Sequence, residues 1–252
     1  SYVFKRQAGM LRRALALLHP ANQPLMSRQS YRHELVAALT IPMAMSLAEG
    51  STVGILARKC FHVCDFSFAL IMAAPSMANL TSFLWARAAR GRRKVPAIVL
   101  LQCLMLACVA SIALVPSHNA SGRILLTALI ILTRCIVSGI LTLRSIVTRH
   151  NYARQYRATV TGRLALVTSI IFTVAPPAFY SLLDWRPEAF RIAYPAAVLI
   201  ATIGVVAFSR IRLRRERELL RFEHKPNAIP VPHGVPGPIY EYDPHQSTPT
   251  FF

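Results

Sequence analysis

The stretch WARAARGRRKVPAIVLLQ, from Trp85 to Gln102, contains five cations within eight residues: Arg87, Arg90, Arg92, Arg93 and Lys94. Apolar sequence lies directly before and directly after this cluster. A charged side chain costs about 2.5–3.5 kcal/mol at the centre of a membrane helix, whereas cations are common in the turns between such helices. The stretch therefore predicts a short basic turn between two membrane-spanning helices.

The composition points in the same direction. Of the 252 residues, 54% are hydrophobic and only 15% are charged, but the net charge is +19. A typical soluble domain has roughly 25% charged residues. An apolar and basic chain is either a membrane protein or a nucleic-acid binder, and the positions of the cations distinguish these classes. The five cysteines are an odd number, which argues against a disulfide framework.

Six stretches are long and apolar enough to cross a bilayer, which takes about 20 residues of helix. They lie near residues 35–57, 66–86, 95–115, 124–143, 164–182 and 192–209. The expected fold is all-α, a polytopic bundle of six transmembrane helices over residues 34–209. A basic segment, 1–33, precedes the bundle, and residues 210–252 form a basic helix end followed by a Pro-rich linker or tail.

The cations alternate between the loops. Twenty-three of the 29 Lys and Arg residues fall in the two terminal segments and in the loops after the second and fourth spans, whereas five fall in the other three loops. Cations favour the cytosolic side of a membrane. Both termini are therefore expected in the cytosol and the protein in the cell (inner) membrane. Because topology accounts for much of the charge, no nucleic-acid partner is needed.

Two ionisable residues, Glu49 and Arg134, lie inside predicted spans. They are roughly 12 and 15 Å from the outer ends of their helices at 1.5 Å per residue, so they are able to meet if the first and fourth helices are neighbours. One interpretation is a polar cavity that handles substrate or a coupling ion, and the other is a structural ion pair. A tandem pair, Pro176 and Pro177, predicts a kink in the fifth span.

The sequence contains no catalytic motif, so an enzyme is not expected. It also predicts no metal site and no cofactor. The segment from Cys60 to Asp65 has metal-binding residue types, but there is no second cluster to complete four ligands.

The loop after the second span resembles a motif of major facilitator superfamily transporters, Gly-x-x-x-Asp-Arg-x-Gly-Arg-Arg/Lys. Gly91, Arg92 and Arg93 match its Gly-Arg-Arg, whereas the aspartate of the motif falls on Ala88. The resemblance implies that Gly91, Arg92 and Arg93 hold a cytosolic gate. Because Ala88 replaces the aspartate of the motif, this loop lacks the carboxylate that takes part in the gating charge network of the family.

The loop after the fourth span is similar to a second motif of this family, with Tyr152, Arg157 and Gly162 in matching places and Ala153 where the family has proline. The resemblance covers about residues 30–225. It implies the N-terminal six-helix half of a twelve-helix transporter, built as a 3+3 inverted repeat, whose partner is a second six-helix half.

The expected function is secondary transport of a small solute by alternating access. Glu49 and Arg134 are the candidates for the transport path, and a proton is one candidate coupling ion. The alternative is a six-span membrane scaffold or signalling subunit without transport activity. Lipid is the expected surrounding in both cases.

Overall fold

The computed structural model describes residues 28–117 and 119–213, together with Glu216, Glu218, Leu220 and Glu223. This part of the chain consists of helices joined by short turns and contains no strand. The prediction of an all-α fold is therefore confirmed for it. The predictions for the N-terminal basic segment up to residue 27 and for the Pro-rich tail lie outside the described residues.

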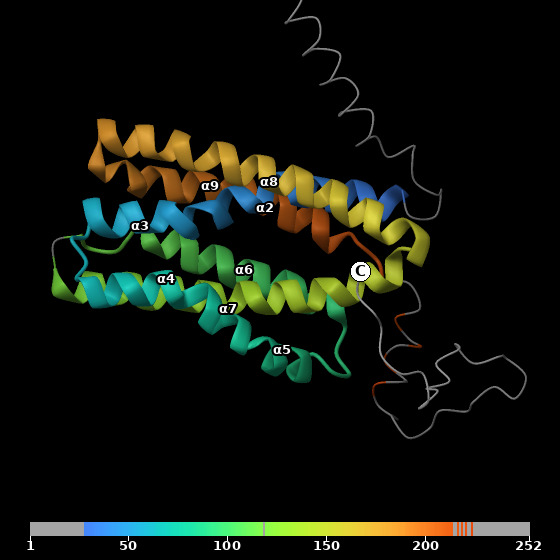
Figure 1. The fold of residues 1–252 in the computed structure, drawn as a ribbon. Helices are drawn as coiled ribbons and strands as arrows, with labels where there is room; N and C mark the ends of the chain where they lie inside the picture. Colours follow the sequence, from blue (N-terminus) through green and yellow to red (C-terminus); the bar gives the residue numbers. More distant parts are fainter. Residues whose placement is uncertain are drawn as a thin grey trace, which may run out of the picture.

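The helices follow the order of the predicted spans (Figure 1). The first predicted span corresponds to α2 and α3, the second to α4 and α5, and the remaining spans to α6, α7, α8 and α9. Their bounds are α2 Arg28–Leu47, α3 Gly50–Lys59, α4 Asp65–Leu80, α5 Ser82–Ala88, α6 Lys94–Ile112, α7 Ala120–Asn151, α8 Arg154–Trp185, the short 3-10 helix η3 Pro187–Ala189, and α9 Phe190–Ser209.

Within the described residues, five helical segments are long and apolar enough to span a membrane, with α2 and α3 taken together as one segment. A sixth results if α4 and α5, which meet at a bend of 41°, form one span. These segments indicate a membrane protein. The bend near Thr81 was not predicted from the sequence.

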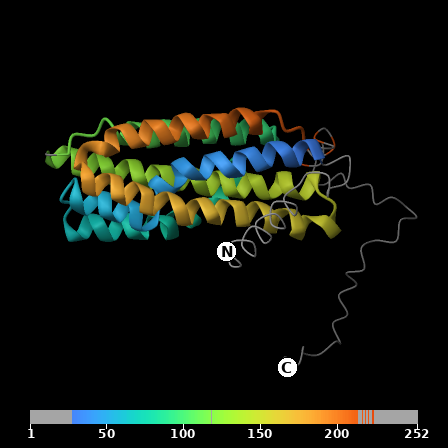
Figure 2. The same ribbon diagram turned by 90° about the horizontal axis from the view of Figure 1, so that it is seen from above.

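The bundle has two groups of packed helices, as the two views of Figures 1 and 2 show. In one group α2 packs against both α8 and α9, and in the other α7 packs against both α4 and α6. Contacts between α6 and α9 join the groups. Small residues allow the closest approach, because a Cβ on Gly204 of α9 would lie 3.2 Å from the Cα of Ala37 in α2.

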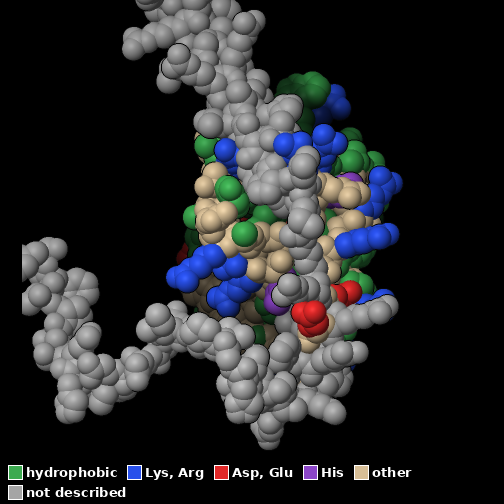
Figure 3. All heavy atoms as spheres, turned by 90° about the vertical axis from the view of Figure 1, so that its right-hand side faces the viewer, with side chains coloured by type: hydrophobic (Ala, Val, Ile, Leu, Met, Phe, Trp, Pro, Cys, Tyr) green, Lys and Arg blue, Asp and Glu red, His purple; other side chains and the backbone are tan. Residues whose placement is uncertain are grey.

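The basic turns gather at one end of the bundle. The start of α2, the α5–α6 turn, the α7–α8 turn and the end of α9 all lie toward the right of Figure 1. Figure 3 views this end and shows Lys and Arg side chains around it. We call it the basic end, and the end with the α3–α4, α6–α7 and α8–α9 turns the opposite end.

Candidate functional site

The first span is interrupted near its middle. Helix α2 ends at Leu47 and α3 begins at Gly50, whose φ of +58° lies in the left-handed region that glycine adopts without strain. Between them Glu49 has an extended backbone, with φ −133° and ψ 148°. An interruption inside a membrane is tolerated only where protein or a water-filled cavity surrounds the backbone.

One backbone carbonyl group at this break accepts a hydrogen bond from a side chain of another helix. Tyr194 of α9 is completely buried, and its hydroxyl donates a hydrogen bond of 2.8 Å to the carbonyl oxygen of Leu47. This bond holds the end of α2 against α9. Tyr194 was not among the residues predicted from the sequence, although a tyrosine within an apolar span is a signal that a polar partner lies nearby.

The break brings Glu49 to Arg134. Arg134 lies near the middle of α7, and its Nη2 is 2.9 Å from Glu49 Oε1, an ion pair without the alignment of a hydrogen bond. The Arg134 side chain is 7% exposed and that of Glu49 is 36% exposed. A small cavity of about 30 Å³ borders Arg134 and Gly50, with room for one or two water molecules. Arg134 is the one charged residue that borders this cavity among the described residues, and the rest of the lining is apolar or glycine.

A second carboxylate faces the same helix. Glu34 of α2, at the edge of the predicted bundle, is 1% exposed, and neither of its oxygens has a hydrogen-bond partner among the described residues. Its nearest cation is Arg144 of α7, with Nη2 4.0 Å from Glu34 Oε2. The first and fourth spans are therefore bridged at two levels, Glu34–Arg144 toward the basic end and Glu49–Arg134 at the centre. From its place in the sequence, Glu34 had not been identified as a site residue.

Tyr152 occupies the turn between α7 and α8 and is buried against Tyr31 and Val160. Burial and, next, the charge of Glu34 raise the pKa of its hydroxyl, so this group stays protonated beside the carboxylate. Arg157 secures the same turn, because its Nη2 donates hydrogen bonds to the carbonyl oxygens of Arg149, at 2.9 Å, and Tyr152, at 3.4 Å. Two of the three residues of the second predicted motif are therefore in contact.

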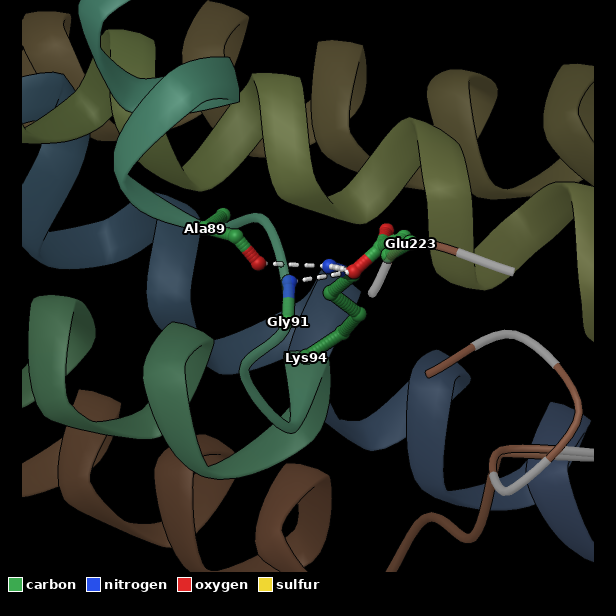
Figure 4. A network of polar contacts seen from close by, with 4 residues as sticks. All are labelled: Ala89, Gly91, Lys94 and Glu223. Carbon is green, nitrogen blue, oxygen red and sulfur yellow. Dashed lines mark hydrogen bonds and ion pairs between the residues drawn. The ribbon is translucent and has the colours of Figure 1, made fainter. Parts of the chain in front are cut away.

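The α5–α6 turn binds a carboxylate from the far end of the chain (Figure 4). The backbone N–H of Gly91 donates a 2.6 Å hydrogen bond to Glu223 Oε2, and Lys94 Nζ lies 2.8 Å from the same oxygen. Lys94 is 1% exposed and also donates to the carbonyl oxygen of Ala89 at 2.6 Å. The positive φ of Gly91, +68°, turns its N–H toward the carboxylate. Glu223 thus supplies an acidic group to a loop in which the motif position, Ala88, has none.

The other predicted residues take no part in these clusters. Arg92 and Arg93 are exposed at the basic end. Gly162 lies within α8, and a Cβ there would meet nothing within 4 Å. Pro176 and Pro177 lie inside α8, which continues as one helix from Arg154 to Trp185. A kink at the two prolines stays a prediction, and the interruptions of the described helices fall at Glu49 and Thr81 instead.

No protein-family model, curated protein or solved structure matches this chain.

Proposed function

We propose that the chain is part of a secondary transporter that moves a small solute by alternating access. The observation that carries this proposal is the Glu49–Arg134 pair at a break in the first span. Charged residues within membrane spans are costly and mark substrate or ion pathways in many proteins. Interrupted helices at mid-membrane depth are the usual sites of substrate and ion binding in secondary transporters.

The packing of the helices supports a related proposal, that the six spans form a 3+3 inverted repeat of the major facilitator type. Exchanging the first three spans with the last three converts the α2–α9 contact into the α7–α6 contact. The same exchange converts α2–α8 into α7–α4 and leaves α6–α9 unchanged. An arrangement with this internal equivalence is expected of two repeated units. In the complete transporter a second six-helix half would pack against part of the exposed surface.

The Glu34–Arg144 pair and the Glu223 contact then have a role in gating. Both lie at the basic end, which we propose faces the cytosol of a cell whose inner membrane holds the protein. In this proposal the Glu34–Arg144 contact, which joins α2 and α7, helps to hold the path closed at that end. Glu223 stands in for the missing aspartate of the loop motif by holding Gly91 and Lys94 together.

The test is solute flux into vesicles that contain the protein in its full reading frame. Arg134→Gln leaves Glu49 without a partner and is expected to lower flux at least a hundredfold with normal membrane insertion. Arg134→Lys, which keeps the charge, is expected to restore part of the activity. Arg123→Gln is the matched control, because it removes a cation from the same helix away from the pair. Unchanged flux in Arg134→Gln would remove this pair from the transport path.

Glu49→Gln separates binding from coupling. If Glu49 carries a proton, this variant is expected to exchange labelled solute across the membrane at a normal rate and to lose accumulation driven by a proton gradient. Equal loss of exchange and accumulation would instead assign Glu49 to solute binding.

The alternative function, a membrane scaffold without transport, is compatible with one observation. In the most apolar 18-residue stretch of α8, only 17% of the residues are buried inside the described bundle. This helix therefore has a large surface available for packing against another helix. A second transporter half would use the same surface. A stable dimer of the chain, together with the absence of flux for a broad panel of solutes, would favour the scaffold.

A further inference from the structure

A cleft of about 440 Å³ opens between α7 and α8 near the basic end. Three arginines line it: Arg144 and Arg149 from α7, and Arg157 from α8. Farther from the turn the apolar side chains of Leu141, Leu164 and Ala165 line the cleft together with Thr161 and Thr168 of α8. On α8, Arg157 and Ala165 are eight residues apart, so the cleft extends roughly 12 Å along the helix. One end is therefore cationic and the other apolar.

The cationic end has more positive charge than its surroundings neutralise. Among the described residues, the acidic partner of the lining arginine Arg144 is Glu34, whose Oε2 lies 4.0 Å from Arg144 Nη2. Arg144 keeps 31% of its side chain exposed. The Nε of Arg157 is buried and has no hydrogen-bond partner among the described residues. Guanidinium groups bind oxyanions through paired hydrogen bonds, and phosphate is a common partner.

We propose that this cleft binds an anionic amphiphile, with a phosphate group at the three arginines and an apolar chain along Leu141, Leu164 and Ala165. An anionic phospholipid of the surrounding bilayer has this chemistry. The site lies where a phosphate at the membrane surface and an acyl chain below it would reach both ends of the cleft. This inference does not depend on transport, so a failure of the proposed function would leave it standing.

The experiment measures lipid binding to the full chain, purified in detergent, by native mass spectrometry. The probes are phosphatidylglycerol, zwitterionic phosphatidylcholine and the soluble compound glycerol 3-phosphate. We expect one equivalent of phosphatidylglycerol to bind at least tenfold more tightly than phosphatidylcholine, whose ammonium group the arginines repel. Similar binding of both lipids would overturn the proposal.

Two substitutions test the two ends of the cleft. Arg149→Gln removes an exposed guanidinium and is expected to weaken phosphatidylglycerol binding about tenfold. Ala165→Trp fills the apolar end and is expected to abolish binding. Arg149→Lys should retain most of it. Size-exclusion profiles identify any variant that fails to fold.

Arg87→Gln is the matched control, because Arg87 is an exposed cation of α5 that does not line the cleft. Equal weakening in Arg87→Gln and Arg149→Gln would show diffuse attraction to the basic end and overturn the proposal. Glycerol 3-phosphate binding could also depend on Arg149 and be unaffected by Ala165→Trp. That result would assign the cleft to soluble phosphate compounds and overturn the proposal that it binds an amphiphile.

Discussion

The two ends of the bundle differ in how far their Lys and Arg side chains are paired with acidic or aromatic side chains. At the opposite end two cations have acidic partners from neighbouring elements: Arg58 forms an ion pair of 2.6 Å with Asp65, and Lys59 pairs with Asp184. Aromatic rings cover further cations there, because the Arg186 guanidinium lies 4.7 Å from the centre of the Trp185 ring. At the basic end Lys94 is neutralised by Glu223, but among the described residues the arginines around it and in the α7–α8 cleft outnumber the carboxylates.

This difference in pairing bears on both the expected orientation in the membrane and the binding of anions. Charge that the chain itself neutralises interacts weakly with lipid or ligand, whereas unneutralised arginines attract anions and resist transfer across the membrane. The basic end is therefore both the expected cytosolic side and the side on which an anion-binding cleft is found.

The strongest test of this comparison uses a native cysteine at the opposite end. Cys64 is exposed, and its hydrogen bond with Ser67, 3.4 Å from Sγ to Oγ, lowers the pKa of its thiol. It is therefore expected to react quickly with a membrane-impermeant maleimide on intact cells. Burial raises the pKa of the Cys60 thiol, so this neighbour is expected to react slowly.

The control for the labelling is Cys64→Ser, which should lose the fast reaction. A cysteine introduced at Arg90, in the basic turn, should react only after the cells are permeabilised. Labelling of the Arg90 position from outside would invert the proposed orientation.

The second-largest effect is expected from breaking the buried contact between Glu223 and Lys94 at the basic end. Glu223→Gln keeps a side-chain oxygen that can accept from Gly91 and Lys94, but it removes the negative charge that neutralises the buried ammonium of Lys94. Loss of a charged partner by a buried group is expected to cost about 3 kcal/mol of stability. Thermal unfolding of the protein in detergent measures this change. A shift no larger than that of Asp65→Asn would mean that the Glu223 contact contributes no more than a surface pair.

The hydrogen bond at the break in the first span lies between the two ends. Tyr194→Phe removes the donor to the carbonyl oxygen of Leu47 and leaves the ring in place. Hydrogen bonds between membrane helices contribute about 1 kcal/mol on average, so the expected loss of stability is of that size. A loss of solute flux much greater than the loss of folded protein would show that the break must be held in this geometry for activity.

The smallest effect is expected at the opposite end. Asp65→Asn removes the partner of Arg58, but the two side chains are 91% and 49% exposed. Exposed ion pairs of this kind contribute less than about 1 kcal/mol. The same thermal unfolding assay is expected to show little change, and salt is expected to matter less here than for lipid binding at the basic end. A destabilisation equal to that of Glu223→Gln would remove the contrast between the ends.

Local properties of the chain were enough to predict the helical fold and the approximate bounds of the spans. Hydrophobic runs of membrane length and the alternation of cations are read directly along the chain, because lipid requires every backbone polar group to be satisfied within its own helix. The burial cost of Glu49 and Arg134 also marked them as a candidate pair before their distance was known. Their function stays a prediction.

The remaining features depend on which helices become neighbours. Glu223 reaches Gly91 across 132 residues of sequence, and Tyr194 reaches Leu47 across 147. The burial of Glu34 follows from the packing of α2 against α8, and the cleft of three arginines follows from the divergence of α7 and α8. No local pattern specifies these contacts, since a side chain's partner depends on helix packing between spans distant in the chain. The sequence therefore predicted the spans and the charge of each turn, and the packing determined which charges were neutralised.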